Sequence, residues 1–193
     1  MITDINQLDL NKTYTYADYL LWQFSERVEL IKGKIFKMSP APKRIHQDIS
    51  RNIEFKLFAH LRKQPCKVYY APFDVRLSKK KKDQLIETVV QPDICVICDE
   101  KKLDDRGCLG APDLIVEILS PSTKKKDITD KFNLYEENSV REYWIVDPDN
   151  QTLLKYVLKD KRYVGEKILD VSEKITSTVF PDLTIVLNEV FEN

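Results

Sequence analysis

The chain has 193 residues, of which 42% are hydrophobic and 32% charged, and its 31 Lys and Arg residues balance 31 Asp and Glu residues. This length and apolar content exclude a disordered chain and favour one compact domain spanning residues 1–193. No apolar run approaches the ~18–20 residues that cross a bilayer. The first ten residues lack the basic start and apolar stretch of a signal peptide, so we expect a cytoplasmic protein.

The few cysteines and histidines limit the chemistry that is available. Cys95 and Cys98 form a CxxC in the β-prone run DICVIC, but residues three apart on a strand point to opposite faces and do not make a zinc knuckle or a redox pair. We therefore expect all four cysteines, which include Cys66 and Cys108, to be reduced thiols packed as small apolar side chains. With only two histidines, catalysis must rest mainly on carboxylates, lysines and hydroxyls.

The first half of the chain predicts helices and short strands in alternation. A short helix is expected over residues 13–24, capped by Thr13 or Thr15, followed by a hairpin of RVELI and KIFKM that turns at Lys32-Gly33 and stops at SPAP. Apolar residues at 45, 49, 53, 57 and 61 predict a long amphipathic helix over 43–63, which Pro65 ends. Strands are then expected at 67–71, 73–77 and 89–98.

The second half predicts a strand, a helix and a strand in succession, after the polar loop DEKKLDDRGCLGAP. The run DLIVEILS is typical of a strand buried on both faces, a helix follows from Ser122 or Thr123 to about Asn138, and REYWIVD forms the next buried strand. This order indicates a βαβ-like unit. The runs TLLKYVL, YVGEKIL and DLTIVL predict further strands, so the fold class is mixed α/β, with a sheet flanked by helices.

Glu117 is the most informative residue, because it is the only polar side chain in the run from Leu114 to Leu119. Burying an ionised carboxylate without partners costs several kcal/mol, so Glu117 needs a salt bridge, a metal cation or a shared proton. Asp93, at the start of another β-prone run, lies 24 positions earlier (117 − 93). Two central strands can aim both carboxylates at one point, where hard oxygen ligands suit Mg²⁺. A turn aspartate is the alternative for Asp93.

Lys131 is the third candidate. With Ile128, Phe132 and Tyr135 it forms a helical i, i+3, i+4, i+7 series, which places this lysine within the apolar stripe. A lysine that faces the core needs an anionic partner, and this helix must pack against the strand that carries Glu117. We therefore expect Lys131 to reach the carboxylate pair. A lysine that snorkels to the edge of the stripe is the alternative.

Further charged residues surround these three in the sequence. Glu29 lies in the first hairpin and shares a strand face with Arg27 and Ile31, and His46 lies in the opening turn of the long helix, at the border of its apolar face. A packing or capping role competes with a ligand role for this histidine. The lysine runs 79–82 and 124–126 are expected either as solvated loops or as a basic rim that attracts phosphate.

Several motifs match a known family. QPD at 91–93, PDLIVEILSPST at 112–123, Asp127, Lys131 and Tyr135, and EYWIVDP at 142–148 resemble the Uma-two family of restriction-endonuclease-like proteins, in the PD-(D/E)XK nuclease superfamily. The segment from Glu29 to Ile35, the Met-Ser-Pro at 38–40 and His46 are similar too, so the resemblance covers about residues 25–150. It implies a restriction-endonuclease-like fold with an N-terminal helix-hairpin-helix-like segment and extra C-terminal strands.

The resemblance also implies roles for individual residues. Asp93 would be the acid of the PD motif and Glu117 the acid of the (D/E)XK motif, both as metal ligands. The motif's lysine should stand two positions after Glu117, where this chain has Leu119. Lys131 is then the expected substitute, and Glu29 resembles the acid that such folds supply from an early element. His46 matches a family position and is included among the catalytic candidates.

The expected activity is Mg²⁺-dependent hydrolysis of phosphodiester bonds, with Mn²⁺ as a substitute ion. Nucleic acid, with DNA favoured, is the implied partner, and a homodimer is an assembly that related nucleases often adopt to cut both strands. Two alternatives stay open at this point. One is a catalytically inactive nuclease-fold module that binds nucleic acid or a protein, which the displaced lysine and the zero net charge favour. The other is a hydrolase of small phosphate esters.

Overall fold

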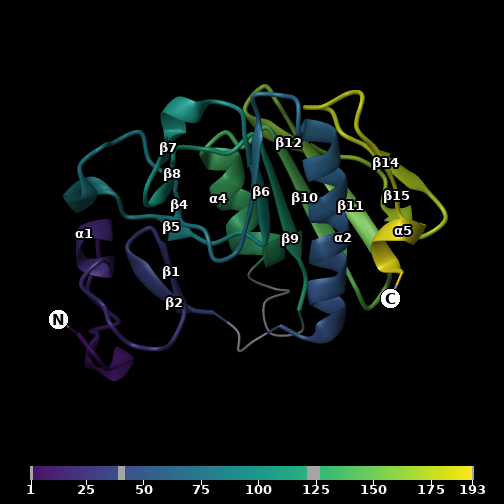
Figure 1. Cartoon of the computed structure of the whole chain (residues 1–193). Coiled ribbons are helices and arrows are strands. Elements are labelled where there is room, and N and C mark those ends of the chain that lie inside the picture. Colours follow the sequence, from purple (N-terminus) through teal and green to yellow (C-terminus); the bar gives the residue numbers. More distant parts are fainter. Residues whose placement is uncertain (1, 39–41, 121–126, 193) are drawn as a thin grey trace.

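The computed structural model describes residues 2–38, 42–120 and 127–192, without the side chains of residues 127 and 128. The N-terminal and C-terminal elements lie at opposite ends of the molecule, and most of the strands lie between them (Figure 1). The described helices are η1 (Ile5–Gln7), α1 (Tyr16–Tyr19), α2 (Arg44–Leu61), η2 (Asp83–Leu85), η3 (Glu100–Lys102), the π-helical η4 (Asp127–Lys131), α4 (Phe132–Glu137) and α5 (Asn188–Phe191).

The largest sheet has seven strands in the order β12-β11-β10-β9-β6-β3, with β13 also paired to β11. Strands β9 and β10 run parallel and are joined through η4 and α4, which confirms the predicted strand, helix and strand unit. The other pairs in this sheet are antiparallel. Its strands are β3 (Lys67–Tyr70), β6 (Ile94–Ile97), β9 (Leu114–Ile118), β10 (Glu142–Asp147), β11 (Thr152–Lys159), β12 (Arg162–Gly165) and β13 (Leu169–Asp170).

A second sheet has six strands in the order β2-β1-β5-β4-β8-β7, and β14 and β15 form a separate antiparallel pair. The predicted hairpin is confirmed as β1 and β2, whose turn places both Lys32 and Gly33 at positive φ, 49° and 76°. The strands of these two sheets are β1 (Val28–Ile31), β2 (Lys34–Lys37), β4 (Val75–Arg76), β5 (Val89–Val90), β7 (Leu103–Asp104), β8 (Gly107–Leu109), β14 (Lys174–Thr176) and β15 (Thr184–Val186).

The prediction of a single continuous strand over residues 89–98 is wrong. Residues 89–90 form β5 in the six-stranded sheet, and residues 94–97 form β6 in the seven-stranded sheet. The break falls at Gln91-Pro92-Asp93, because Pro92 has no N–H to donate to a ladder. The chain therefore passes from one sheet to the other through the QPD motif, and this crossing brings residues of both sheets together.

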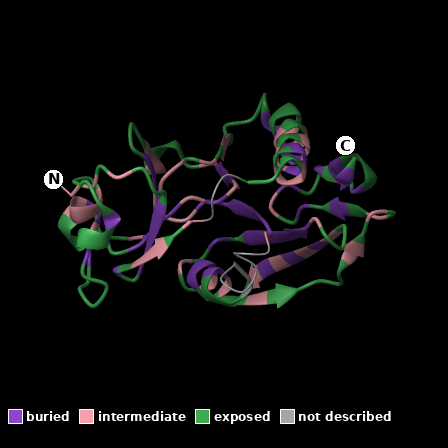
Figure 2. Cartoon of the chain, turned by 90° about the horizontal axis from the view of Figure 1, so that it is seen from below, coloured by how far each residue is buried: buried purple, intermediate pink, exposed green. Residues whose placement is uncertain are grey.

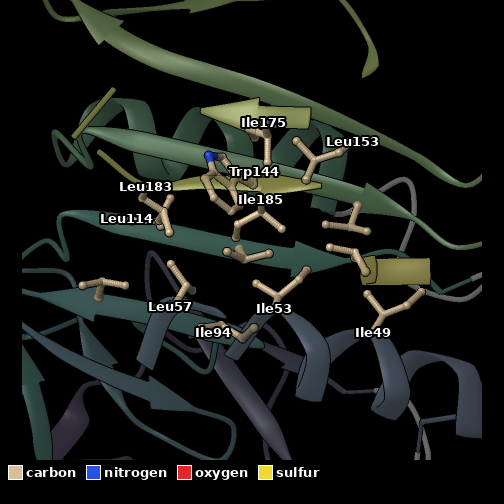
Figure 3. Packing of buried hydrophobic residues seen from close by; sticks show 14 of the residues in the cluster. Ile49, Ile53, Leu57, Ile94, Leu114, Trp144, Leu153, Ile175, Leu183 and Ile185 are labelled. Carbon is tan, nitrogen blue, oxygen red and sulfur yellow. The ribbon is translucent and has the colours of Figure 1, made fainter. Parts of the chain in front are cut away.

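Helix α2 packs along one face of the seven-stranded sheet. Its 18 residues bury an apolar face that begins at Ile49 and recurs through Ile53, Leu57 and Leu61, as the periodicity predicts. Figure 3 shows this face against Ile94, Leu114 and Trp144 of the sheet, with β14 and β15 on the far side of the cluster. The helix is thus fixed relative to β6 and β9, the two strands that lead to the candidate acids.

The opposite face of this sheet carries a separate core. There Ile115, Leu134 and Tyr143 contribute to a buried cluster formed with residues of α4 and of the six-stranded sheet. A third cluster lies under the N-terminal segment and includes Tyr16 and Leu30. Figure 2 shows the buried stretches of the strands between exposed helix faces and loops. Strand β9 is covered on both faces, in agreement with its near-continuous apolar sequence.

The expectation of four reduced cysteines is wrong for two of them, because Cys66 and Cys98 form a disulfide. Lys67 of β3 pairs with Ile97 of β6, so these cysteines lie opposite each other one step further along the antiparallel ladder. Cys95 lies in the core on the α4 side, whereas Cys98 packs on the α2 side, so the CxxC does point to both faces. Cys95 and Cys108 are free and buried.

Other differences lie in weakly patterned segments. The polar loop at 99–112 contains β7 and β8, and the N-terminal helix is only Tyr16–Tyr19, started by a capping box at Thr15. The lysine run 79–82 is exposed. The expected helix start at Ser122 or Thr123, the run 124–126 and the Ser-Pro at 39–40 lie outside the described residues. Within the described part of the chain, no helix is both long and apolar enough to span a membrane.

Candidate active site

The two acids singled out from the sequence are cross-strand neighbours. Ile94 pairs with Val116 and Cys95 with Ile115 in the antiparallel β6 and β9 ladder. One step beyond the last pair, Asp93 therefore lies opposite Glu117. The backbone N–H of Ile118 donates a hydrogen bond to Asp93 Oδ2 at 2.8 Å, which fixes the aspartate against the strand that carries the glutamate. The antiparallel register thus brings both carboxylates to one end of the sheet.

Lys131 connects two buried carboxylates. Its ammonium lies 2.7 Å from Glu117 Oε1 and 3.1 Å from Glu29 Oε1, and its side chain is only 4% exposed. Glu117 belongs to the seven-stranded sheet and Glu29 to the six-stranded sheet. The snorkelling alternative is therefore wrong, since the lysine faces inward and pairs with anions. A buried ammonium between two carboxylates is satisfied both electrostatically and in its hydrogen bonds.

Tyr135 also belongs to this site, although its sequence position alone predicted no role for it. Its hydroxyl donates a 2.6 Å hydrogen bond to Glu117 Oε1, and the whole side chain is buried. Burial, together with the charge of Glu117, raises the pKa of Tyr135 well above its usual value, so it stays a hydroxyl donor. The i, i+4 spacing from Lys131 and its place in the family motif were the available signals.

The carboxylate of Glu29 is bound by the backbone of the QPD motif. The backbone N–H of Gln91 donates to Glu29 Oε1 at 3.1 Å, so this oxygen accepts from both the motif and Lys131. The Gln91 side chain in turn accepts from the guanidinium of Arg27 at 2.7 Å and donates to Asp74 Oδ1 at 2.8 Å. The position of Glu29 therefore depends on the same crossing that places Asp93.

His46 reaches the acidic pair from the opening turn of α2. Its Nε2 lies 3.3 Å from Asp93 Oδ2, and the two side chains are 13% and 22% exposed. All five residues predicted as site residues are therefore joined in one chain of contacts, from His46 through Asp93 and the strand β9 backbone to Glu117, Lys131 and Glu29. His60, at the other end of α2, lies near Gln64 and not in this site.

The charge of this site suits a divalent cation. Three carboxylates and one ammonium carry a net charge of −2 when all four are ionised (−3 + 1). Among residues 2–38, 42–120 and 127–192, no group of three or more His, Cys, Asp or Glu side chains has the geometry to hold a metal ion. Mg²⁺, however, is often held by only one or two carboxylates together with waters and substrate phosphates. Asp93 and Glu117, two carboxylates on neighbouring segments, are the candidates for this role.

Comparison with models of protein families decides which family this chain belongs to. A family model described as "Uma2: Putative restriction endonuclease" matches residues 16–188. The chain belongs to the Uma2 family. The family resemblance noted in the sequence is thereby confirmed, and the matched range contains all five candidate residues as well as Tyr135.

Three known proteins are similar to this chain. Two uncharacterized proteins of Synechocystis sp. are 27% and 28% identical over 67% and 70% of this chain. The matches span 65% of the first relative, slightly less than two thirds of its length, and 76% of the second. A crystal structure described as a putative nuclease belonging to DUF820 from Anabaena variabilis has a TM-score of 0.73 at 20% identity, covering 92% of this chain and 97% of that one. It confirms the mixed α/β nuclease-like fold.

Proposed function

We propose that this Uma2 protein is a Mg²⁺-dependent nuclease that hydrolyses phosphodiester bonds, with DNA as the favoured substrate. The observation that carries the proposal is the buried Lys131 ammonium bound to Glu117 and Glu29, beside the cross-strand acid Asp93. The descriptions of the family and of the Anabaena protein support the same class of activity. A buried lysine and converging acids within one cluster are typical of a catalytic site.

In this proposal Asp93 and Glu117 hold the ion. A bound Mg²⁺ lowers the pKa of a coordinated water and neutralises charge that develops on the phosphate. His46, 3.3 Å from Asp93 Oδ2, restrains the aspartate carboxylate, and the Ile118 N–H restrains it from the other side. Lys131 lies within 3.1 Å of two carboxylates, and in this proposal its ammonium acts as a donor that orients water and stabilises the phosphate's negative charge.

The direct test is cleavage of plasmid, single-stranded DNA and RNA in Mg²⁺ or Mn²⁺. We expect metal-dependent nicking that Glu117→Gln abolishes and that Glu137→Gln, a change to an exposed surface carboxylate, leaves intact. Linear plasmid as an early product would favour a homodimer with two active sites. Binding of nucleic acid without any cleavage would refute the enzyme proposal.

A second test addresses the metal ions without turnover. Mg²⁺ is expected to raise the melting temperature of the wild type, because it relieves repulsion between Asp93 and Glu117. Asp93→Ala should lose this shift. Equal shifts in both proteins would contradict this metal site whatever the cleavage assay shows.

One observation favours a different function. The third position of the (D/E)XK motif is Leu119, which is buried in the core on the α4 side. A nuclease fold that has lost catalysis would tolerate this residue, and a zero net charge suits a protein partner as well as nucleic acid. Binding without metal-dependent cleavage supports this module, whereas turnover of phosphatase substrates alone would support a small phosphate ester hydrolase.

A further inference from the structure

One oxygen of Glu117 accepts two hydrogen bonds from the same helical segment. Lys131 Nζ donates to Glu117 Oε1 at 2.7 Å and Tyr135 Oη donates to it at 2.6 Å. The two donors are four residues apart, so they lie on one face of the segment formed by η4 and α4. Two donors from one segment therefore bind this oxygen, and they restrain the rotation of the carboxylate.

The two donors differ in what else they do. Lys131 carries charge and is shared with Glu29, whereas the Tyr135 hydroxyl is neutral and donates a hydrogen bond to Glu117. The Tyr135 ring is held in a T-shaped contact with Tyr143 of β10, at 5.1 Å between centroids and 77° between planes. Since β10 pairs with β9, the ring is fixed relative to the strand that carries Glu117.

We propose that Tyr135 is a positioning residue, whose hydroxyl holds Glu117 Oε1 and so orients the carboxylate that would bind the metal ion. This inference rests on the proposed metal site and goes beyond it by assigning metal affinity to a residue that touches neither ion nor substrate. Hydrogen bonds to a liganding carboxylate orient it before the ion arrives, and loss of such a partner typically weakens metal affinity about 10–100-fold.

The variant that tests this is Tyr135→Phe, which removes the hydroxyl and keeps the ring. Tyr163→Phe is a matched control, because Tyr163 belongs to the same aromatic cluster and its hydroxyl donates to the Val140 carbonyl at 3.0 Å. Calorimetric titration of the resting proteins with Mn²⁺ should show a Kd about tenfold or more higher for Tyr135→Phe. The control should stay within about twofold of the wild type.

Two further measurements separate positioning from packing and from direct catalysis. In a Glu117→Gln background, Tyr135→Phe should cause no additional loss of Mn²⁺ affinity, because it acts through that carboxylate. In cleavage assays the metal concentration for half-maximal rate should rise in Tyr135→Phe by the same factor as the Kd. Its kcat at saturating metal should remain within about threefold of the wild type.

Several results would overturn the proposal. An unchanged Kd in Tyr135→Phe would do so, and so would a loss of kcat that saturating metal does not restore, since Tyr135 would then act on the reacting atoms. If the wild type binds Mn²⁺ but cleaves nothing, the nuclease proposal fails while the Kd comparison still decides the role of Tyr135. If the wild type binds no Mn²⁺, both fail. Should Tyr135→Phe not fold, Tyr135→Met also lacks the hydroxyl and adapts to the same space.

Discussion

Replacing Lys131 by Met should destabilise the metal-free protein strongly. The change keeps the length and apolar stem of the side chain but removes the ammonium that lies within 3.1 Å of both Glu29 and Glu117. Those two side chains are 1% and 4% exposed, so water does not replace the lost cation. Removing one partner of a buried ion pair costs about 3–5 kcal/mol.

The same substitution at an exposed ion pair provides the control. Lys32 binds Glu137 at 2.7 Å, but these side chains are 63% and 52% exposed, so Lys32→Met should cost no more than about 1 kcal/mol. Urea unfolding in EDTA, followed through tryptophan fluorescence, measures both variants. With a slope of about 2 kcal/mol per molar urea, the midpoint should fall by about 1.5–2.5 M for Lys131→Met and by less than 0.5 M, roughly, for the control.

A loss of stability in Lys131→Met no larger than that in Lys32→Met would contradict this prediction. The expected cost comes from carboxylates left without a cation, so adding Glu29→Gln to Lys131→Met should recover about 1–3 kcal/mol. Mg²⁺ should also restore part of the stability of Lys131→Met. A double variant that is less stable than Lys131→Met by the full cost of Glu29→Gln alone would show that the three charges are not coupled.

The remaining predictions concern other parts of the molecule. Glu142→Gln should lower the free energy of unfolding, measured by thermal unfolding, by about 2–3 kcal/mol, because Glu142 is fully buried and accepts four hydrogen bonds. The control Glu189→Gln, at the surface, should cost under about 1 kcal/mol. Equal losses of stability in the two variants would contradict this prediction. Cys95 and Cys108 should not react with a thiol reagent at pH 8 in the folded protein, because burial raises the pKa of both, that of Cys108 to about 12. Unfolding without reductant should release two thiols, and four would disprove the disulfide. Gly107→Ala should destabilise the protein by about 2–4 kcal/mol, because φ at Gly107 is 118° and the added Cβ would lie 2.2 Å from a backbone oxygen. Urea unfolding measures this loss, and an unchanged unfolding midpoint would show that the substitution causes no strain.

The sequence predicted a contact correctly where single residues contradicted their surroundings. Glu117 was a lone acid in an apolar strand and Lys131 a lone cation in an apolar stripe, and burial requires each to have a partner of opposite charge. The structure places them 2.7 Å apart. Tyr135 raised no such conflict, because a tyrosine is compatible with an apolar stripe, and the partner of its hydroxyl became visible only in the folded structure.

Pairing between distant segments could not be predicted. The Cys66–Cys98 disulfide depends on the register of β3 against β6, which the alternation of apolar residues alone does not specify. Likewise, β5 and β6 form one continuous β-prone run in the sequence, and their division between two sheets follows from the path of the chain at Pro92. The short strands β7 and β8 lie in a polar segment where pairing, rather than hydrophobicity, creates the structure.

The disulfide also changes the protein when it is unfolded. It joins residues 32 positions apart and so keeps Gln91, Asp93 and the passage between the two sheets inside a closed loop of the denatured chain. The chain-entropy relation gives about 3.7 kcal/mol for a loop of this size. Folding must restrict the chain to bring Asp93 opposite Glu117, and the disulfide already imposes part of this restriction on the denatured chain. A strong reductant would therefore remove the stabilisation that the disulfide provides.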